Sequence, residues 1–69
     1  MDIKAQVGRA VQRLRVARGW SQEDLAAESG LHRTYVSGVE RGVRNPTVTI
    51  VARLAKALKV PPSDLLPNR

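Results

Sequence analysis

The fold of this chain is decided by residues 22–41, which read QEDLAAESGLHRTYVSGVER. Apolar side chains recur at helical spacing on both sides of a central glycine, at Leu25, Ala26, Leu31, Val36 and Val39. The small side chain of Ala26 allows two helices to cross closely. Gly30 allows a sharp turn with positive φ, which costs a residue with a β-carbon about 1 kcal/mol. The stretch therefore predicts two short helices packed across a tight turn.

The second of these predicted helices has an unusually polar outer side. It buries only Val36 and Val39, and the other side chains near its start are polar, namely His32, Arg33, Thr34, Tyr35 and Ser37. Such a thin apolar side is enough to hold the helix to its scaffold, and it leaves the polar side open. We therefore expect the polar side to contact another molecule.

Helical spacing continues through the rest of the chain, which glycine and proline divide into segments. In the first segment Asp2 is the expected N-cap and Gly19 the terminator. Ser21 caps the second segment, with Asp24 at the position of a capping-box partner. One all-α domain, residues 1–69, is predicted. Its five short helices are expected at about 2–18, 21–30, 32–42, after the cap Thr47, and after Pro61 and Pro62, where Leu65 and Leu66 close the core.

The composition restricts the chemistry that the chain can support. A chain of 69 residues forms one small domain, whose core is marginal unless its helices pack well. Cysteine is absent and there is one histidine, which excludes disulfides, thiolate zinc sites and histidine clusters. The sequence contains no nucleophile–base pair and no glycine-rich phosphate loop, and Glu23, Asp24 and Glu28 fit a solvated face. We expect no enzymatic activity, no metal, no cofactor and no small-molecule ligand.

The charge indicates a polyanionic partner. Lysine and arginine number 12 against 6 acidic residues, which gives a net charge of +6. This excess favours nucleic acid or an anionic membrane surface as the partner. A membrane is disfavoured because no run reaches the roughly 18 apolar residues of a span, and because the arginines fall in predicted loops and helix starts. The N-terminus also lacks the apolar core of a signal peptide, so we expect a cytoplasmic protein.

Residues 22–41 resemble the helix-turn-helix of the Cro/repressor (XRE) family of bacterial and phage DNA-binding proteins. The similarity continues in RLRVARGWSQEDLA (13–26), ERGVRNPTV (40–48) and IVARLAKALKVPPSDLL (50–66), so it covers most of the chain. It implies a compact five-helix lambda-repressor-like DNA-binding domain with the helix-turn-helix at its second and third helices. Ser29 departs from the family, which often has an apolar residue there. Residues 30–42 look closest to the restriction–modification controllers within the family.

The resemblance also implies a function. It implies a transcription regulator that binds a palindromic operator in double-stranded DNA as a homodimer, with the helix at about 32–41 in the major groove. A dimer is expected because one recognition helix alone buries too little surface to hold DNA. We expect this dimer to form through the C-terminal helices. Such a protein, of bacterial or phage origin, acts in the cytoplasm at the nucleoid. An alternative of another class is an antitoxin-type module that covers a toxin partner, with DNA binding secondary.

The family match assigns roles to individual side chains. Arg33 and Thr34 are expected to read base edges, where an arginine can pair with guanine through two hydrogen bonds, and His32 and Ser37 are expected to assist. Phosphate contacts are expected from the start of the second helix and around the third, from Gln22, Tyr35, Arg41, Arg44 and Asn45. Two alternatives remain open, because His32 also suits a helix cap and the ring of Tyr35 also suits the core.

An acid and a glycine in the stretch need explanations of their own. An acid near DNA is repulsive, and the family pairs the positions of Arg15 and Glu40 across the core, which implies a structural ion pair. At the place of Gly38 family members often carry a long polar side chain. Two explanations stay open for this glycine: the backbone approaches DNA closely, or base reading is concentrated in Arg33 and Thr34.

Overall fold

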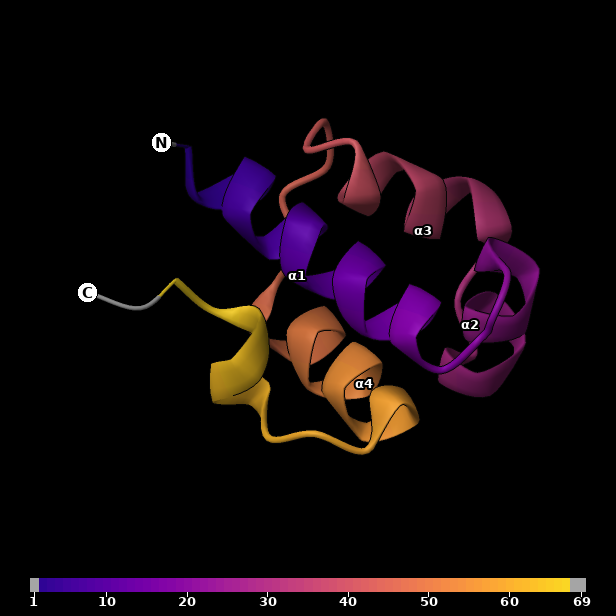
Figure 1. Ribbon diagram of the computed structural model, residues 1–69. Helices are drawn as coiled ribbons and strands as arrows, with labels where there is room; N and C mark the ends of the chain where they lie inside the picture. The colour runs from indigo at the N-terminus through magenta and orange to yellow at the C-terminus, as the bar shows by residue number, and fades with distance from the viewer. Residues whose placement is uncertain (1, 68–69) are drawn as a thin grey trace.

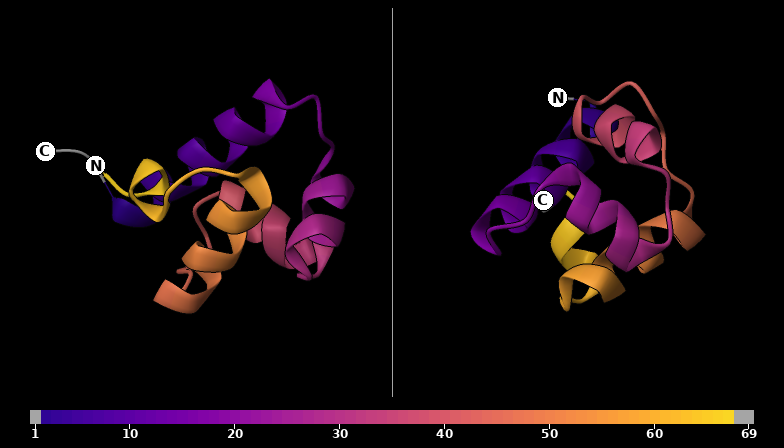
Figure 2. Two further views of the ribbon diagram at one scale, coloured as in Figure 1. Left: turned by 90° about the horizontal axis from the view of Figure 1, so that it is seen from below. Right: turned by 90° about the vertical axis from the view of Figure 1, so that its right-hand side faces the viewer.

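The computed structural model describes residues 2–67, which form α-helices and no strand within that range. The elements are α1 (Ile3–Ala17), α2 (Gln22–Ser29), α3 (Arg33–Glu40), α4 (Val48–Leu58) and a 3-10 turn, η1 (Pro62–Leu65). In Figure 1, α1 crosses the middle of the domain, with α3 above it and α4 below. Figure 1 and the left view of Figure 2 show α2 at one end of the domain and η1 at the other. The predicted all-α class is confirmed, and none of the described helices is long and apolar enough to cross a membrane.

The predicted fifth helix is wrong in its extent, because the chain forms only a single 3-10 turn there. Pro62 opens this turn, and Leu66 leaves it with extended backbone angles, φ −99° and ψ 153°. Leu66 precedes Pro67, and the ring of a proline disfavours the helical region for the residue before it. As a result Leu65 is fully buried, whereas Leu66 is 48% exposed.

The helices begin at the capping residues that the sequence predicts. Asp2 Oδ1 accepts the backbone N–H two residues later at 3.1 Å, and Thr47 Oγ1 accepts the N–H three residues later at 3.2 Å. Ser21 Oγ accepts the Asp24 N–H at 3.0 Å, while the Asp24 carboxylate accepts the Ser21 N–H at 2.9 Å, which completes a capping box. These bonds satisfy N–H groups that have no partner within the first helical turn. The predicted caps are confirmed.

One hydrophobic core joins all the elements. Its largest fully buried side chains come from each helix and from η1, and they are Val11, Leu25, Val36, Val39, Leu54, Leu58 and Leu65. Ser29 lies beside this core and is also buried, although the family often has an apolar residue at its position. Its hydroxyl donates to the Leu25 carbonyl at 2.7 Å, so the polar group is satisfied inside α2.

Two contacts outside the helix-turn-helix position α3. Gly8 on α1 lies against the end of α3, where a β-carbon would collide with the carbonyl oxygens of Val39 and Glu40. Arg53 on α4 donates to the carbonyls of Ser29 at 3.2 Å and Gly30 at 3.0 Å. The turn between α2 and α3 is therefore tied to α4, and the end of α3 is pressed onto α1.

Candidate nucleic-acid interface

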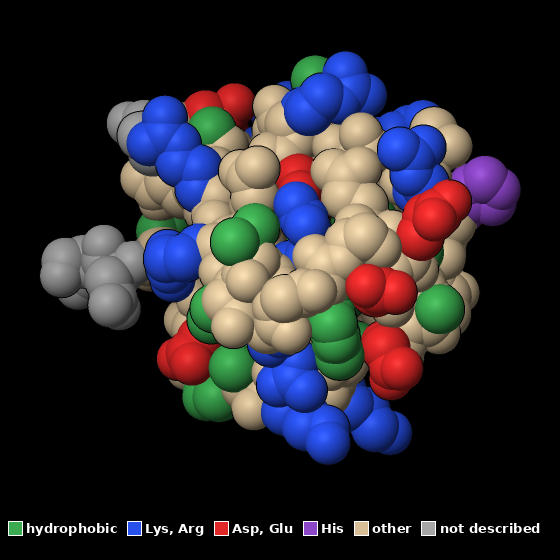
Figure 3. Space-filling view, turned by 45° about the vertical axis from the view of Figure 1, so that its right-hand side comes forward, with side chains coloured by type: hydrophobic (Ala, Val, Ile, Leu, Met, Phe, Trp, Pro, Cys, Tyr) green, Lys and Arg blue, Asp and Glu red, His purple; other side chains and the backbone are tan. Residues whose placement is uncertain are grey.

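The outer side of α3 carries exposed polar residues over a buried apolar side. Val36 and Val39 are fully buried, whereas Arg33 and Thr34 are exposed and Ser37 is half-buried. Ser37 follows Arg33 by about one turn, so both project from one face of the helix. Figure 3 shows a group of lysine and arginine side chains along the upper edge of the molecule, the edge on which α3 lies in Figure 1. Arg33, Thr34 and Ser37, three of the expected base-reading residues, thus lie on the outer side of α3, and Arg33 and Thr34 are accessible there.

His32 is the N-cap of α3. Its Nδ1 accepts the backbone N–H of Thr34 at 3.3 Å, and its side chain is exposed. An imidazole nitrogen accepts a hydrogen bond only when it carries no proton, so this cap uses the form with a bare Nδ1. The capping role of His32 is therefore present in the structure, and its contact with DNA stays a prediction.

The loop after α3 folds back over the helix. Gly42 reverses the chain with a φ of +77°, and the N–H groups of Val43 and Arg44 both donate to the Gly38 carbonyl, at 3.0 and 3.2 Å. Arg41, Arg44 and Asn45 are exposed. Of the three residues that the sequence assigns to phosphate contacts after α3, Arg44 is held against α3 by these bonds, whereas Asn45 lines a hollow with Ile3 and Val48.

Gly38 provides the space in which the side chain of Arg44 lies. A β-carbon at Gly38 would lie 2.5 Å from Arg44 Cγ. The guanidinium carbon of Arg44 is 5.9 Å from the centre of the Tyr35 ring, within the range of a cation–π contact. Tyr35 is half-buried and packs on the core, so its ring serves both the core and the surface. This packing is a third explanation for Gly38, which the sequence did not suggest.

An ion pair between Arg15 and Glu40 joins α1 to the end of α3. Arg15 Nε donates to Glu40 Oε2 at 2.7 Å and Arg15 Nη2 donates to Glu40 Oε1 at 3.0 Å, which is the pair that the sequence led us to expect. The side chains are 12% and 3% exposed. The hydrogen bonds with Glu40 raise the pKa of Arg15, and burial opposes this in part. Arg15 Nη1 also donates to the Trp20 carbonyl at 2.7 Å.

Gln22 extends this pair toward the start of α2. Its Nε2 donates to Glu40 Oε1 at 3.1 Å, so the carboxylate at the end of α3 holds the Gln22 amide in place. The side chain is half-buried at the first position of α2, where a helix N-terminus suits a phosphate. The phosphate contact of Gln22 remains a prediction, and the structure adds a positioning contact that the sequence did not suggest.

Sequence reasoning missed Gly8 and Arg53, although both hold α3 in place. Gly8 lies inside a long helical segment, and the sequence there does not indicate which other helix packs against it. Arg53 is one of two exposed cations on α4, the other being Lys56, and its partners are backbone carbonyls far away in sequence. Only the packing of α4 against α2 reveals its role.

The comparisons with known proteins agree with this arrangement. The family model described as "Helix-turn-helix" matches residues 11–65. The control protein C.BamHI of Bacillus amyloliquefaciens is 44% identical over 66 residues, which span 94% of this chain and 82% of that protein.

Solved structures extend the similarity to three dimensions. The restriction-modification controller C.AhdI of Aeromonas hydrophila superposes with a TM-score of 0.88 at 46% identity, over 91% of this chain and 96% of that one. The controller C.Esp1396I, solved as a tetramer with its natural 35 base-pair operator, gives a TM-score of 0.83 at 37% identity, over 90% and 82% of the two chains. The chain therefore belongs to the helix-turn-helix family of the Cro/repressor (XRE) type, and restriction-modification controllers are among its relatives.

Proposed function

We propose that this protein is a transcription regulator that binds a palindromic operator in double-stranded DNA, with α3 in the major groove. The observation that carries the proposal is the exposed polar face of α3, where Arg33 and Thr34 stand above the fully buried Val36 and Val39. The net charge of +6 suits a polyanion, and a relative of the same fold, C.Esp1396I, has been solved with its operator. The relatives reported above are controller proteins, and they give the antitoxin alternative no support.

Within this function the polar residues divide into two groups. Arg33 and Thr34, with Ser37 and His32, read base edges, since these side chains surround the outward start of α3. A second group holds phosphates from the start of α2, from α3 and from the end of α3 onward, and it consists of Gln22, Tyr35, Arg41, Arg44 and Asn45. Arg15 and Glu40 contribute indirectly because their ion pair holds α3 against α1. The role is regulatory and not catalytic, and its place is the bacterial cytoplasm.

An apolar face away from α3 suits a second copy of the chain. Ile3, Val48 and Leu66 are 61%, 87% and 48% exposed, and all three line one hollow together with Val7, Val51 and Pro62. An exposed apolar patch of this kind is typical of an interface. It lies at the start of α4 and beside η1, and it includes Ile3 of α1, so a homodimer that forms through the C-terminal elements would cover it. Two copies bring two recognition helices to half-sites about 34 Å apart.

Selection of bound duplexes from a random pool tests the function. We expect a palindromic sequence to be enriched, and its affinity to fall with salt with a log–log slope of roughly −0.9 for each phosphate contact. Arg33→Ala should flatten the preference among duplexes while weak general binding remains. Equal affinity for the selected palindrome and a scrambled duplex would refute the proposal. Val48→Asp should shift the protein toward monomer in sedimentation, and an unchanged oligomeric state would place the interface elsewhere.

A further inference from the structure

We propose that Gly38 is a positioning residue for DNA recognition: because it has no side chain, it seats Arg44 across α3 and against Tyr35. The loop arginine then occupies the part of the reading face that residue 38 leaves bare. The inference rests on the proposed function and deepens it, since it states how one DNA-contacting side chain is arranged before DNA is bound.

The backbone of the loop is fixed directly above Gly38. The Gly38 carbonyl accepts two N–H groups, from Val43 at 3.0 Å and from Arg44 at 3.2 Å. The left-handed conformation of Gly42, with φ +77°, turns the chain so that both donors reach this one acceptor. The backbone of Arg44 is therefore held close to α3, so its side chain can lie along the surface of this helix.

The side chain of Arg44 then follows the surface of α3. A β-carbon at Gly38 would lie 2.5 Å from Arg44 Cγ, 3.5 Å from Nε and 3.6 Å from Cδ, so the aliphatic stem crosses the glycine. The guanidinium reaches Tyr35, one turn earlier in the helix, at 5.9 Å from the ring centre. The stem and the head of Arg44 are thus held by two different residues of α3.

The space at Gly38 serves Arg44 and not the packing of the helices. The three atoms nearest to a β-carbon at this position all belong to the Arg44 side chain. Gly8 is the contrasting case, because a β-carbon there would collide with backbone carbonyl oxygens of α3. A substitution at Gly8 must move a helix, whereas a substitution at Gly38 has only to displace a flexible side chain.

Seating Arg44 before binding favours the complex. An arginine that moves freely in solution loses rotamer freedom when it is held at an interface, and this loss weakens binding. Arg44 has already lost part of that freedom in the unbound protein. Glycine inside a helix is itself unfavourable relative to alanine, so Gly38 lowers the stability of α3 while it improves the arrangement of the DNA-binding face.

Four proteins test the inference: the wild type, Gly38→Ala, Arg44→Ala and the double variant. We expect Gly38→Ala to melt at the same temperature as the wild type or higher, because alanine is the better helix former. Its affinity for the selected operator should fall roughly three- to tenfold, the effect of ordering one arginine on binding. The double variant should bind like Arg44→Ala alone, since Gly38 acts only through Arg44.

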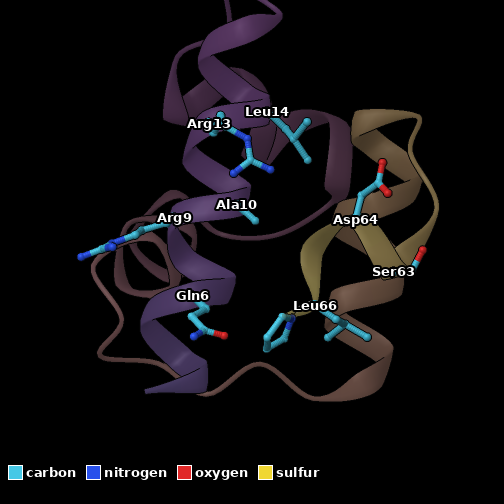
Figure 4. Close-up of a pocket in the computed structure, with 9 residues that line it drawn as sticks. Gln6, Arg9, Ala10, Arg13, Leu14, Ser63, Asp64 and Leu66 are labelled. Atoms are coloured by element: carbon cyan, nitrogen blue, oxygen red, sulfur yellow. The ribbon is translucent and has the colours of Figure 1, made fainter. Parts of the chain in front are cut away.

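Arg13→Ala is the matched control for the loss of one positive charge. Arg13 lines a separate hollow between α1 and η1, together with Gln6, Ser63 and Asp64, as Figure 4 shows. We expect it to lower operator affinity clearly less than Arg44→Ala does, because it lies away from α3. A loss of equal size for the two variants would mean that net charge and not position matters, which would overturn the proposal.

A measurement without DNA separates this inference from the proposed function. Tyr35 is the only tyrosine, so in NMR spectra of the free protein the Arg44 side-chain protons should show its ring-current shift and cross-peaks to it. Gly38→Ala should remove both. Unchanged Arg44 signals, multiplicative losses of affinity in the double variant, or a melting temperature lowered by Gly38→Ala would each overturn the inference. If the wild type shows the seated Arg44 but selects no duplex, the proposed function fails, and with it the DNA role given to Gly38.

Discussion

Replacement of Glu40 by glutamine should lower the free energy of unfolding by about 3 kcal/mol, because it leaves Arg15 charged and without its counter-ion. Both partners are shielded from water, with side chains that are 12% and 3% exposed. The pair also connects three elements, since it ties the end of α3 to α1 and, through Gln22, to the start of α2. Loss of the pair therefore weakens the attachment of α3 to both α1 and α2.

The magnitude follows from the hydrogen bonds that the carboxylate accepts. Glu40 receives three: from Arg15 Nε at 2.7 Å, Arg15 Nη2 at 3.0 Å and Gln22 Nε2 at 3.1 Å. An amide keeps one oxygen and turns an NH₂ group toward one of these donors, so at least one charged hydrogen bond worth about 1.5–3 kcal/mol is lost. Removal of one partner of a buried pair costs about 3–5 kcal/mol. The partial exposure of Arg15 favours the lower end.

Chemical unfolding measures this loss. Urea titrations followed by circular dichroism give the free energy directly, and the fluorescence of Trp20, the only tryptophan, reports the same region because its carbonyl accepts Arg15 Nη1. A domain of this size should melt roughly 12–24 °C lower after a loss of 3 kcal/mol. All variants must be compared at one protein concentration, because the proposed dimer would also add to stability. Glu28→Gln, at an exposed position on α2, is the matched control and should change little.

A change below about 0.5 kcal/mol for Glu40→Gln, no larger than for typical surface substitutions, would refute this reasoning. A double variant gives a second check. Arg15→Met together with Glu40→Leu removes both charges. The free energy of unfolding that this double variant loses should be smaller than the sum of the losses in Arg15→Met alone and Glu40→Leu alone. Strictly additive losses would show that the two residues act independently, contrary to the geometry of their hydrogen bonds.

Three further substitutions test the local contacts that form the helix-turn-helix. Ser21→Ala removes the capping box of α2 and should lower stability by about 1 kcal/mol in urea titrations, and a loss near zero would contradict the cap. Gly30→Ala places a β-carbon at φ +72° and close to Arg53 Nη2, so a loss of about 1–2 kcal/mol is expected, and none would mean that the turn adapts. Arg53→Ala removes two hydrogen bonds to the end of α2 and should cost about 1 kcal/mol, with faster amide exchange in the turn as its specific signature.

Much of the fold is determined by short-range signals that the sequence shows directly. The caps Asp2, Ser21 and Thr47 each bond an N–H within three residues, so their geometry is decided inside one helical turn. Gly30 adopts the left-handed conformation that its place between two apolar segments predicts. The apolar spacing of Val36 and Val39 likewise determines which side of α3 is buried, and therefore which side faces a partner.

The tertiary structure alone decides features that depend on residues distant in sequence or on space. Gly8 and Gly38 look alike as helix glycines, yet one receives the backbone of α3 and the other the side chain of Arg44. The exposed face at Ile3, Val48 and Leu66 joins three segments that no periodicity connects. Local pattern determines the conformation of each segment and the side that it buries, because those interactions span a few residues. The group that fills the space above a helix glycine depends on how the packed helices cross. No single segment of the sequence encodes that crossing.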